Sequence, residues 1–116
     1  MTMKEEKYAE LFDAFAKAPI EEFLKLLFKG ISPEVRRQLV LEDVSYHRLS
    51  AELVTLEAWM CMVPVESNRW IWVRVECGRD GAVQEQFFTK DSYRQQALGS
   101  LEECIEYYNN KEDKNE

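Results

Sequence analysis

The chain contains the stretch Arg69-Trp-Ile-Trp-Val-Arg-Val-Glu-Cys77, followed by Gly78-Arg-Asp-Gly81 and then by Ala82-Val-Gln-Glu-Gln-Phe-Phe88. Residues 70–77 are rich in β-branched and aromatic side chains, which favour a β-strand. The two glycines around Arg-Asp are typical of a tight turn, because glycine adopts a positive φ at little cost. The stretch therefore predicts a β-hairpin. A two-residue turn would place Arg74 opposite Glu85 and Trp72 opposite Phe87, and a bulge would shift this register by one residue.

The first strand of this hairpin has two unlike faces, because side chains alternate across a strand. One face is wholly apolar and consists of Ile71, Val73, Val75 and Cys77. The other is aromatic and charged and consists of Trp70, Trp72, Arg74 and Glu76. Residues 52–63 alternate in a similar way and favour a further strand, although their leucines also fit a helix. We expect a three-stranded antiparallel meander at about 51–88.

Helices are predicted on either side of the meander. Residues 4–17, and a segment that begins at Pro19, carry apolar side chains at helical spacing. Ser32 and Pro33 are typical of a third helix start, which gives a helical segment over about 4–42, and residues 43–50 show no period. A last helix is expected at about 92–109, with a frayed acidic tail at 110–116. The sequence thus predicts a single α+β domain with N-terminal helices, a three-stranded antiparallel β-meander and a C-terminal helix.

The size and net charge of the chain limit the classes of function that it can have. Its 116 residues fit one domain that can bury a core without disulfides. The net charge of −7 disfavours direct binding of nucleic acid or of an anionic membrane, which requires a basic surface. Residues 101–116 hold two lysines against six carboxylates, a net −4, so much of the acidity lies at the C-terminal end.

The cysteine pattern indicates a protein without a structural metal. Cys61, Cys77 and Cys104 are widely spaced and odd in number, and no Cys-x-x-Cys or Cys/His cluster is present. We therefore expect no metal site and no cofactor. Unpaired thiols suit a reducing compartment. The charged N-terminus lacks an apolar signal core and no apolar run reaches the length of a membrane span, so we expect a cytoplasmic protein without membrane contact.

Three tryptophans are the first candidate for a functional site. Trp59, Trp70 and Trp72 fall on the same face of the expected sheet as Arg74 and Glu76. Tryptophan and arginine are enriched in binding hot spots, so an exposed face of this kind would be a partner-binding site. In the competing arrangement, the N-terminal helices cover this face and the tryptophans form a second core layer. The apolar stripes of those helices favour the second arrangement, because they need a surface to pack on.

The last helix carries the second candidate, the acidic row Glu102, Glu103 and Glu106. Such a row could imitate a phosphate backbone or meet a basic protein surface, although a solvated helix face is the simpler interpretation. Adjacent carboxylates elsewhere do not face each other on a helix, so they predict no acid–base pair. His47 is the one histidine, and no nucleophile or base accompanies it at a recognisable spacing. No catalytic residue is nominated.

These observations lead us to expect a small acidic, non-enzymatic protein-interaction module, such as an inhibitor, an adaptor or an immunity-type protein. Its partner would be a protein, with a basic surface in the simplest case. A concrete version is an inhibitor of a nucleic-acid-handling machine, of the kind that mobile elements encode against host defence. Two alternatives stay open. One is a small enzyme or ligand-binding domain with a pocket between the sheet and the helices, and the other is a structural subunit that self-assembles, for example as a homodimer.

Overall fold

The computed structural model describes the backbone of residues 11–90 and 97–114, with side chains up to residue 110. The described part of the chain begins with the helices α2 (Leu11–Lys17), α3 (Pro19–Leu27) and α4 (Pro33–Arg36). The strands β1 (Leu39–Arg48), β2 (Leu53–Met62), β3 (Trp70–Gly78) and β4 (Val83–Thr89) follow, with the short 3-10 helix η1 (Val65–Ser67) between β2 and β3, and α5 (Leu101–Lys114) comes last. The expected α+β class is confirmed. The sheet, however, has four antiparallel strands in the order β1-β2-β3-β4, where three were expected.

The additional strand is β1, which replaces the end of the expected third helix and the unpatterned residues after it. Its side chains that pack toward the core are Leu39, Leu41, Val44 and Tyr46. The spacing changes between the second and third of these because a β-bulge lies between Leu41 and Asp43. A bulge adds one residue to a strand and breaks the period of two, so this strand carries no clear alternation in the sequence.

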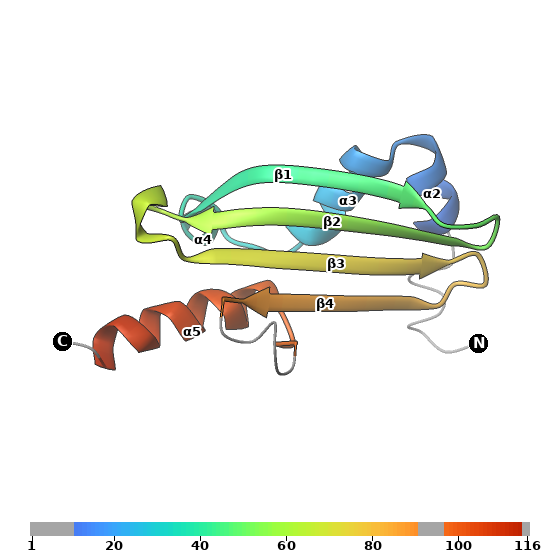
Figure 1. Ribbon diagram of the computed structural model, residues 1–116. Coiled ribbons are helices and arrows are strands. Elements are labelled where there is room, and N and C mark those ends of the chain that lie inside the picture. The colour runs from blue at the N-terminus through green and yellow to red at the C-terminus, as the bar shows by residue number, and fades with distance from the viewer. Residues whose placement is uncertain (1–10, 91–96, 115–116) are drawn as a thin grey trace.

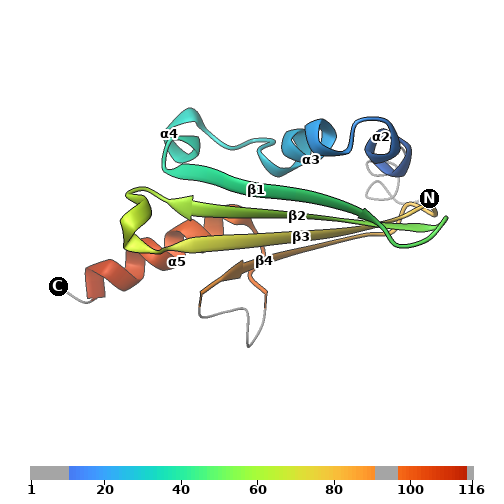
Figure 2. The same cartoon turned by 45° about the horizontal axis from the view of Figure 1, so that its top comes forward.

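The described α-helices lie on one side of the sheet, as Figures 1 and 2 show together. Phe12, Phe15 and Phe23 from α2 and α3, and Leu101 and Ile105 from α5, pack into a single core with the sheet. We call this side of the sheet the covered face. Its buried side chains from β2, β3 and β4 are Val54, Leu56, Ala58, Met60, Met62, Ile71, Val73, Val75, Cys77, Phe87 and Thr89. The predicted strand at 52–63 and the apolar face of the hairpin are thereby confirmed.

The β3–β4 register differs by one residue from the expected one. Arg74 pairs with Gln86 and Trp72 with Phe88, so the pairs expected for a two-residue turn are wrong. Gly81 has a φ of +93°, and its N–H donates to the carbonyl oxygen of Gly78 at 3.0 Å. This geometry fits a three-residue loop that ends in a left-handed residue, and such a loop adds a bulge next to the turn. The shift turns Phe87 into the core and Phe88 to the opposite side of the sheet.

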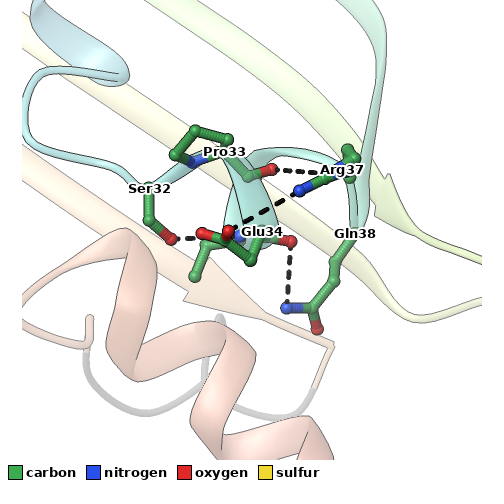
Figure 3. Close-up of polar contacts among 6 residues, drawn as sticks. Ser32, Pro33, Glu34, Arg37 and Gln38 are labelled. Carbon is green, nitrogen blue, oxygen red and sulfur yellow. Dashed lines mark hydrogen bonds and ion pairs between the residues drawn. The ribbon is translucent and has the colours of Figure 1, made fainter.

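The short helix α4 begins where the sequence indicates. The Oγ of Ser32 accepts a hydrogen bond from the N–H of Val35 at 3.2 Å, which caps the helix start (Figure 3). At the other end, Arg37 Nε donates to the carbonyl oxygen of Pro33 at 3.2 Å, and the same oxygen accepts the backbone N–H of Arg37 at 3.0 Å (Figure 3). The helix then ends after a single turn and the chain enters β1, so the expected helix end near residue 42 is wrong.

The last helix begins later than expected, at Leu101. Ser100 Oγ accepts from the N–H of Glu103 at 3.2 Å, and the Glu103 carboxylate accepts from the N–H of Gly99 at 2.7 Å. This reciprocal arrangement is close to a capping box, for which Ser100-Leu-Glu-Glu103 is the sequence signature. The helix continues to Lys114, so residues 110–114 are helical where a frayed tail was expected. Residues 92–96 of the expected helix and residues 4–10 of the first one lie outside the described part of the chain.

The hydroxyl of Tyr108 fixes α5 to the end of the sheet. It donates to the carbonyl oxygen of Trp70 at 2.6 Å and accepts from the N–H of Lys90 at 2.8 Å. Because Ile71 pairs with Thr89, Trp70 and Lys90 stand at the next position of the β3–β4 ladder. The hydroxyl thus bridges the two backbone groups where the direct pairing of the strands ends.

Candidate partner-binding face

The side of the sheet opposite the α-helices is called the open face, because none of the α-helices that the structure describes packs on it (Figures 1 and 2). Only the short η1 lies against one end of this face within the described residues, where Cys61 contacts Val65. The register places its side chains in rows that cross the strands. These rows are Asp43–Trp59–Trp72–Phe88, Ser45–Glu57–Arg74–Gln86 and His47–Thr55–Glu76–Gln84. The arrangement in which α2 and α3 cover the tryptophans is therefore wrong, since both helices pack on the covered face.

The first row contains a ladder of stacked aromatic rings. The ring centroids of Trp59 and Trp72 lie 5.5 Å apart at an interplanar angle of 15°, and those of Trp72 and Phe88 lie 4.8 Å apart at 24°. The ring of Trp70 joins the ladder at 5.3 Å from Trp59, tilted by 56°. We call these four residues the aromatic ladder. Stacked pairs of this kind contribute about 0.5–1.5 kcal/mol each beyond the area that they bury.

The ladder ends at Trp59, which is the most accessible of the three tryptophans, with 38% of its surface exposed. One face of its indole stacks on Trp72 of β3, and β1 is the strand on the other side of β2. The residue of β1 at this position is Asp43, and Glu42 lies beside it in the bulge. No aromatic side chain continues the ladder onto β1, which leaves a tryptophan face next to two exposed carboxylates.

A polar network borders the ladder on β2 and β3. Glu57 accepts a hydrogen bond from Nε1 of Trp72 at 3.2 Å and lies 3.9 Å from Nε of Arg74. The Arg74 guanidinium also forms an ion pair with Glu76 at 3.0 Å. The three charged side chains are each about one-third exposed, so water screens these interactions only in part. The network fixes the indole of Trp72 and neutralises the one cation of the central strands.

The open face is apolar at the end next to η1. Val40 is 38% exposed and lies opposite Cys61, and Val65 of η1 is 45% exposed. The Cys61 thiol is buried beneath this corner and donates to the carbonyl oxygen of Val65 at 3.6 Å. Burial raises the pKa of this thiol, and the negative charge of Glu42 adds to the rise.

The structure places the predicted site residues in two separate groups. Trp59, Trp70, Trp72, Arg74 and Glu76 lie together on the open face. The acidic row Glu102, Glu103 and Glu106 is exposed on α5, which packs on the covered face. Within this row, Glu103 also has a structural role, because its carboxylate accepts from the N–H of Gly99. The two candidate sites therefore do not form one surface.

The residues of the open face that the predicted site lacked include Phe88, Asp43 and Glu57. Phe88 was missed because the hairpin register was wrong by one residue, and Asp43 because β1 was not recognised as a strand. Glu57 shares the face with the tryptophans in any strand interpretation of residues 52–63, and its spacing of two from Trp59 was a usable signal.

A hollow of about 330 Å³ lies on the covered face between α3 and α5. Its floor contains Val73, Val75 and Phe87 of the sheet, and Phe23 and Leu101 belong to its walls. Lys29, Glu85 and Glu102 also line it and supply its charged groups. This is the pocket between sheet and helices that the ligand-binding alternative requires.

The remaining chemically reactive side chains are dispersed. His47 is exposed opposite Thr55, whereas Cys61 lies opposite Val40 toward the other end of β1. Burial raises the pKa of Cys77 to about 11 and that of Cys104 to about 12, so both are protonated thiols at neutral pH. Over residues 11–90 and 97–110, no group of three His, Cys, Asp or Glu side chains is placed to hold a metal ion. Within the described part of the chain, no helix combines the length and the apolar character needed to span a membrane.

Comparison of the chain with protein-family models, with curated proteins and with solved structures gave no match.

Proposed function

We propose that the protein is a small non-enzymatic interaction module that binds a protein partner through the open face of its sheet. The observation that carries the proposal is the aromatic ladder, which lies on the side of the sheet away from the described α-helices. A sheet face that only meets water is usually polar, as in the alternating strands of antiparallel sheets. Large aromatic side chains grouped on such a face are typical of a binding surface.

The charge of the chain supports a partner with a basic surface. A net charge of −7 attracts such a surface over a distance and suppresses contact with other acidic molecules. An inhibitor, an adaptor or an immunity-type protein is the role that suits a small acidic module of this kind. Its concrete form would be an inhibitor of a nucleic-acid-handling protein. Three unpaired buried thiols suit a reducing location such as the cytoplasm.

The proposal is tested by affinity capture from the native host with three forms of the tagged protein. Trp59→Ser removes the exposed end of the aromatic ladder. Leu49→Ser is the matched control, because Leu49 is 57% exposed but follows the end of β1, next to the turn. We expect one stoichiometric partner that is retained by the wild type and by Leu49→Ser and is lost with Trp59→Ser. A partner captured equally by all three forms would refute the open face as the binding site.

The self-assembly alternative is tested by the mass of the purified protein in solution. Analytical ultracentrifugation over a range of concentrations distinguishes a monomer from a homodimer, and Trp59→Ser tells whether a dimer uses the open face. We expect a monomer, because a second copy would bring the carboxylates of two open faces together. A wild-type dimer that Trp59→Ser dissociates would replace the proposed partner by the chain itself.

The hollow between α3 and α5 supports a second candidate function, the binding of a small ligand with an apolar body. Native mass spectrometry of the freshly purified protein tests this candidate by detecting a bound small molecule. Phe87→Ala would enlarge the floor of the hollow and change the occupancy of such a molecule, whereas Trp59→Ser would leave it unchanged. A protein that carries no small molecule and still loses its partner with Trp59→Ser would favour the interaction module.

A further inference from the structure

The open face has a chemistry that defines its partner more closely than the proposed function does. We propose that the face binds a cationic segment of the partner, with an arginine or lysine side chain seated on the outer ring face of Trp59 beside the carboxylates of Glu42 and Asp43. This inference rests on the proposed function, because it names the kind of partner that the same face would accept.

The position of Trp59 supplies the first argument. Its indole is stacked on Trp72 of β3, which fixes the ring, while 38% of the residue's surface stays exposed and Asp43 of β1 pairs with it on the other side. A cation over an indole face is attracted by the ring quadrupole, most strongly when the ring is tryptophan. The stacking also means that the side chain is already ordered, so less conformational entropy is lost when a cation binds.

The carboxylates of the bulge supply the second argument. The bulge between Leu41 and Asp43 places two consecutive acidic residues next to Trp59. Within the described residues, the carboxylates of Glu42 and Asp43 have no ion-pair or hydrogen-bond partner, in contrast to Glu57 and Glu76, which hold Arg74. A guanidinium group would gain an aromatic face and two carboxylates at once, which is the combination that arginine recognition requires.

The negative charge of the open face disfavours two other kinds of partner, a nucleic acid and a second copy of this chain. Glu42, Asp43, Glu57 and Glu76 stand against the single guanidinium of Arg74 across the strands. Arg69, at the end of the sheet, is engaged with Val63 and Ser67. A nucleic acid would bring phosphates toward this excess of negative charge, and a second copy would bring the same carboxylates. A basic polypeptide is the macromolecule with the complementary charge.

The test uses the full-length protein and short synthetic peptides as probes. Acetyl-Gly-Arg-Gly-Arg-Gly-Arg-amide is titrated while the indole N–H signals of the three tryptophans are followed by NMR. The matched peptide with citrulline in place of arginine has nearly the same shape without the charge, with a carbonyl oxygen where arginine has a guanidinium nitrogen. We expect the arginine peptide to shift the Trp59 signal most and the citrulline peptide to leave it in place. A neutral glucose hexasaccharide and a glutamate peptide complete the series. The inference would be overturned if either of them shifted the Trp59 indole signal and the arginine peptide did not.

Charge-neutral substitutions locate the interaction. Glu42→Gln and Asp43→Asn each remove one negative charge beside Trp59. We expect each to lower the affinity for the arginine peptide about threefold to fivefold, as for a charge pair near the surface. Glu106→Gln removes the same charge from α5 on the covered side, and we expect less than about a 1.5-fold effect at moderate salt. Equal losses for all three variants would mean a bulk charge effect or a contact with the acidic row of α5, and would overturn the inference.

The partner experiment separates failure of this inference from failure of the proposed function. Trp59→Ser could lose the captured partner while Asp43→Asn and Glu42→Gln retain it fully. The open face would then bind a partner without using the partner's cationic side chains, and only this inference would fail. If Trp59→Ser retains the partner, both fail. If Trp59→Ser and Asp43→Asn lose it and Glu106→Gln retains it, both stand.

Discussion

The hydroxyl of Tyr108 gives the most quantitative prediction for the stability of the fold. Tyr108→Phe removes one oxygen that donates to the carbonyl oxygen of Trp70 and accepts from the N–H of Lys90. The ring stays buried, because Tyr108 is only 4% exposed and packs in the core with the rest of α5. The substitution therefore tests two hydrogen bonds without opening a cavity.

The expected loss follows from the net value of a hydrogen bond in a protein. Each bond contributes about 0.5–1.5 kcal/mol, and partly buried backbone groups can recover some of this through water, so we expect a loss of about 1–2 kcal/mol. With an m-value of about 1.5 kcal/mol per molar urea, the midpoint of unfolding falls by about 1 M while the m-value stays constant.

The assay is urea unfolding followed by tryptophan fluorescence. Tyr46→Phe is the control, because Tyr46 is half-buried on β1 and its hydroxyl makes no hydrogen bond to the described residues. We expect the control to stay within about 0.5 kcal/mol of the wild type, as for substitutions that remove no specific interaction. A Tyr108→Phe protein as stable as the control would contradict the bridge between α5 and the sheet. Faster hydrogen exchange at the Lys90 amide in the variant would locate the loss.

Three further predictions concern other features of the fold. Ser100→Ala removes the cap of α5 and should lower the free energy of unfolding by about 1 kcal/mol, measured by urea unfolding, whereas Ser100→Asp should retain most of it. Gly81→Ala forces a side chain onto a residue with a φ of +93° and should cost about 1–2 kcal/mol, although no atom lies within 4 Å of the added carbon, and Gly81→Asn should cost less. Burial raises the pKa of Cys77 to about 11 and that of Cys104 to about 12. Their contribution to the free energy of unfolding is therefore complete below pH 9.0 and is lost as the pH rises through these values. The free energy of unfolding should fall by up to about 1.4 kcal/mol per pH unit for each thiol above that point, and a Cys77→Ala, Cys104→Ala variant that shows the same slope would disprove this origin.

The central hairpin and the strand before it could be predicted from the sequence because their alternation is unbroken. Ile71, Val73 and Val75 form one face without a polar interruption, and the same holds for the inward side chains of β2. The start of α4 was equally accessible, because Ser32 and Pro33 act through local hydrogen bonding and local geometry. Signals of this kind depend on neighbours in the chain and not on the tertiary structure.

The features that escaped prediction depend on single residues that change the phase of a pattern. The bulge after Leu41 hides β1, and the left-handed conformation of Gly81 shifts β4 by one residue. The capping box at Ser100 could have set the start of α5, since its pattern is present in the sequence. Periodicity alone cannot reveal a shift of phase, because the same residues fit two registers.

The side of the sheet that the helices cover also could not be decided from the sequence. Both faces carry large hydrophobic side chains, and the N-terminal helices can in principle pack on either. The helices pack on the covered face, where every position from Val54 to Met62 that points inward is apolar and fits a close-packed core. The open face has Glu57, Arg74 and Glu76 between its aromatic side chains, and covering them would bury charged groups. For the candidate site, the sequence thus identified the tryptophans and their charged neighbours but not their exposure.

The most direct test of the central claim is oxidative footprinting of Trp59 in the free protein and in the complex with its captured partner. We expect Trp59 to be oxidised readily in the free protein and to be protected when the partner binds, while exposed Leu49 next to the β1–β2 turn reacts equally in both states. A Trp59 side chain that is protected in the free protein, or one that reacts as readily in the complex, would contradict the open face as the surface that binds the partner.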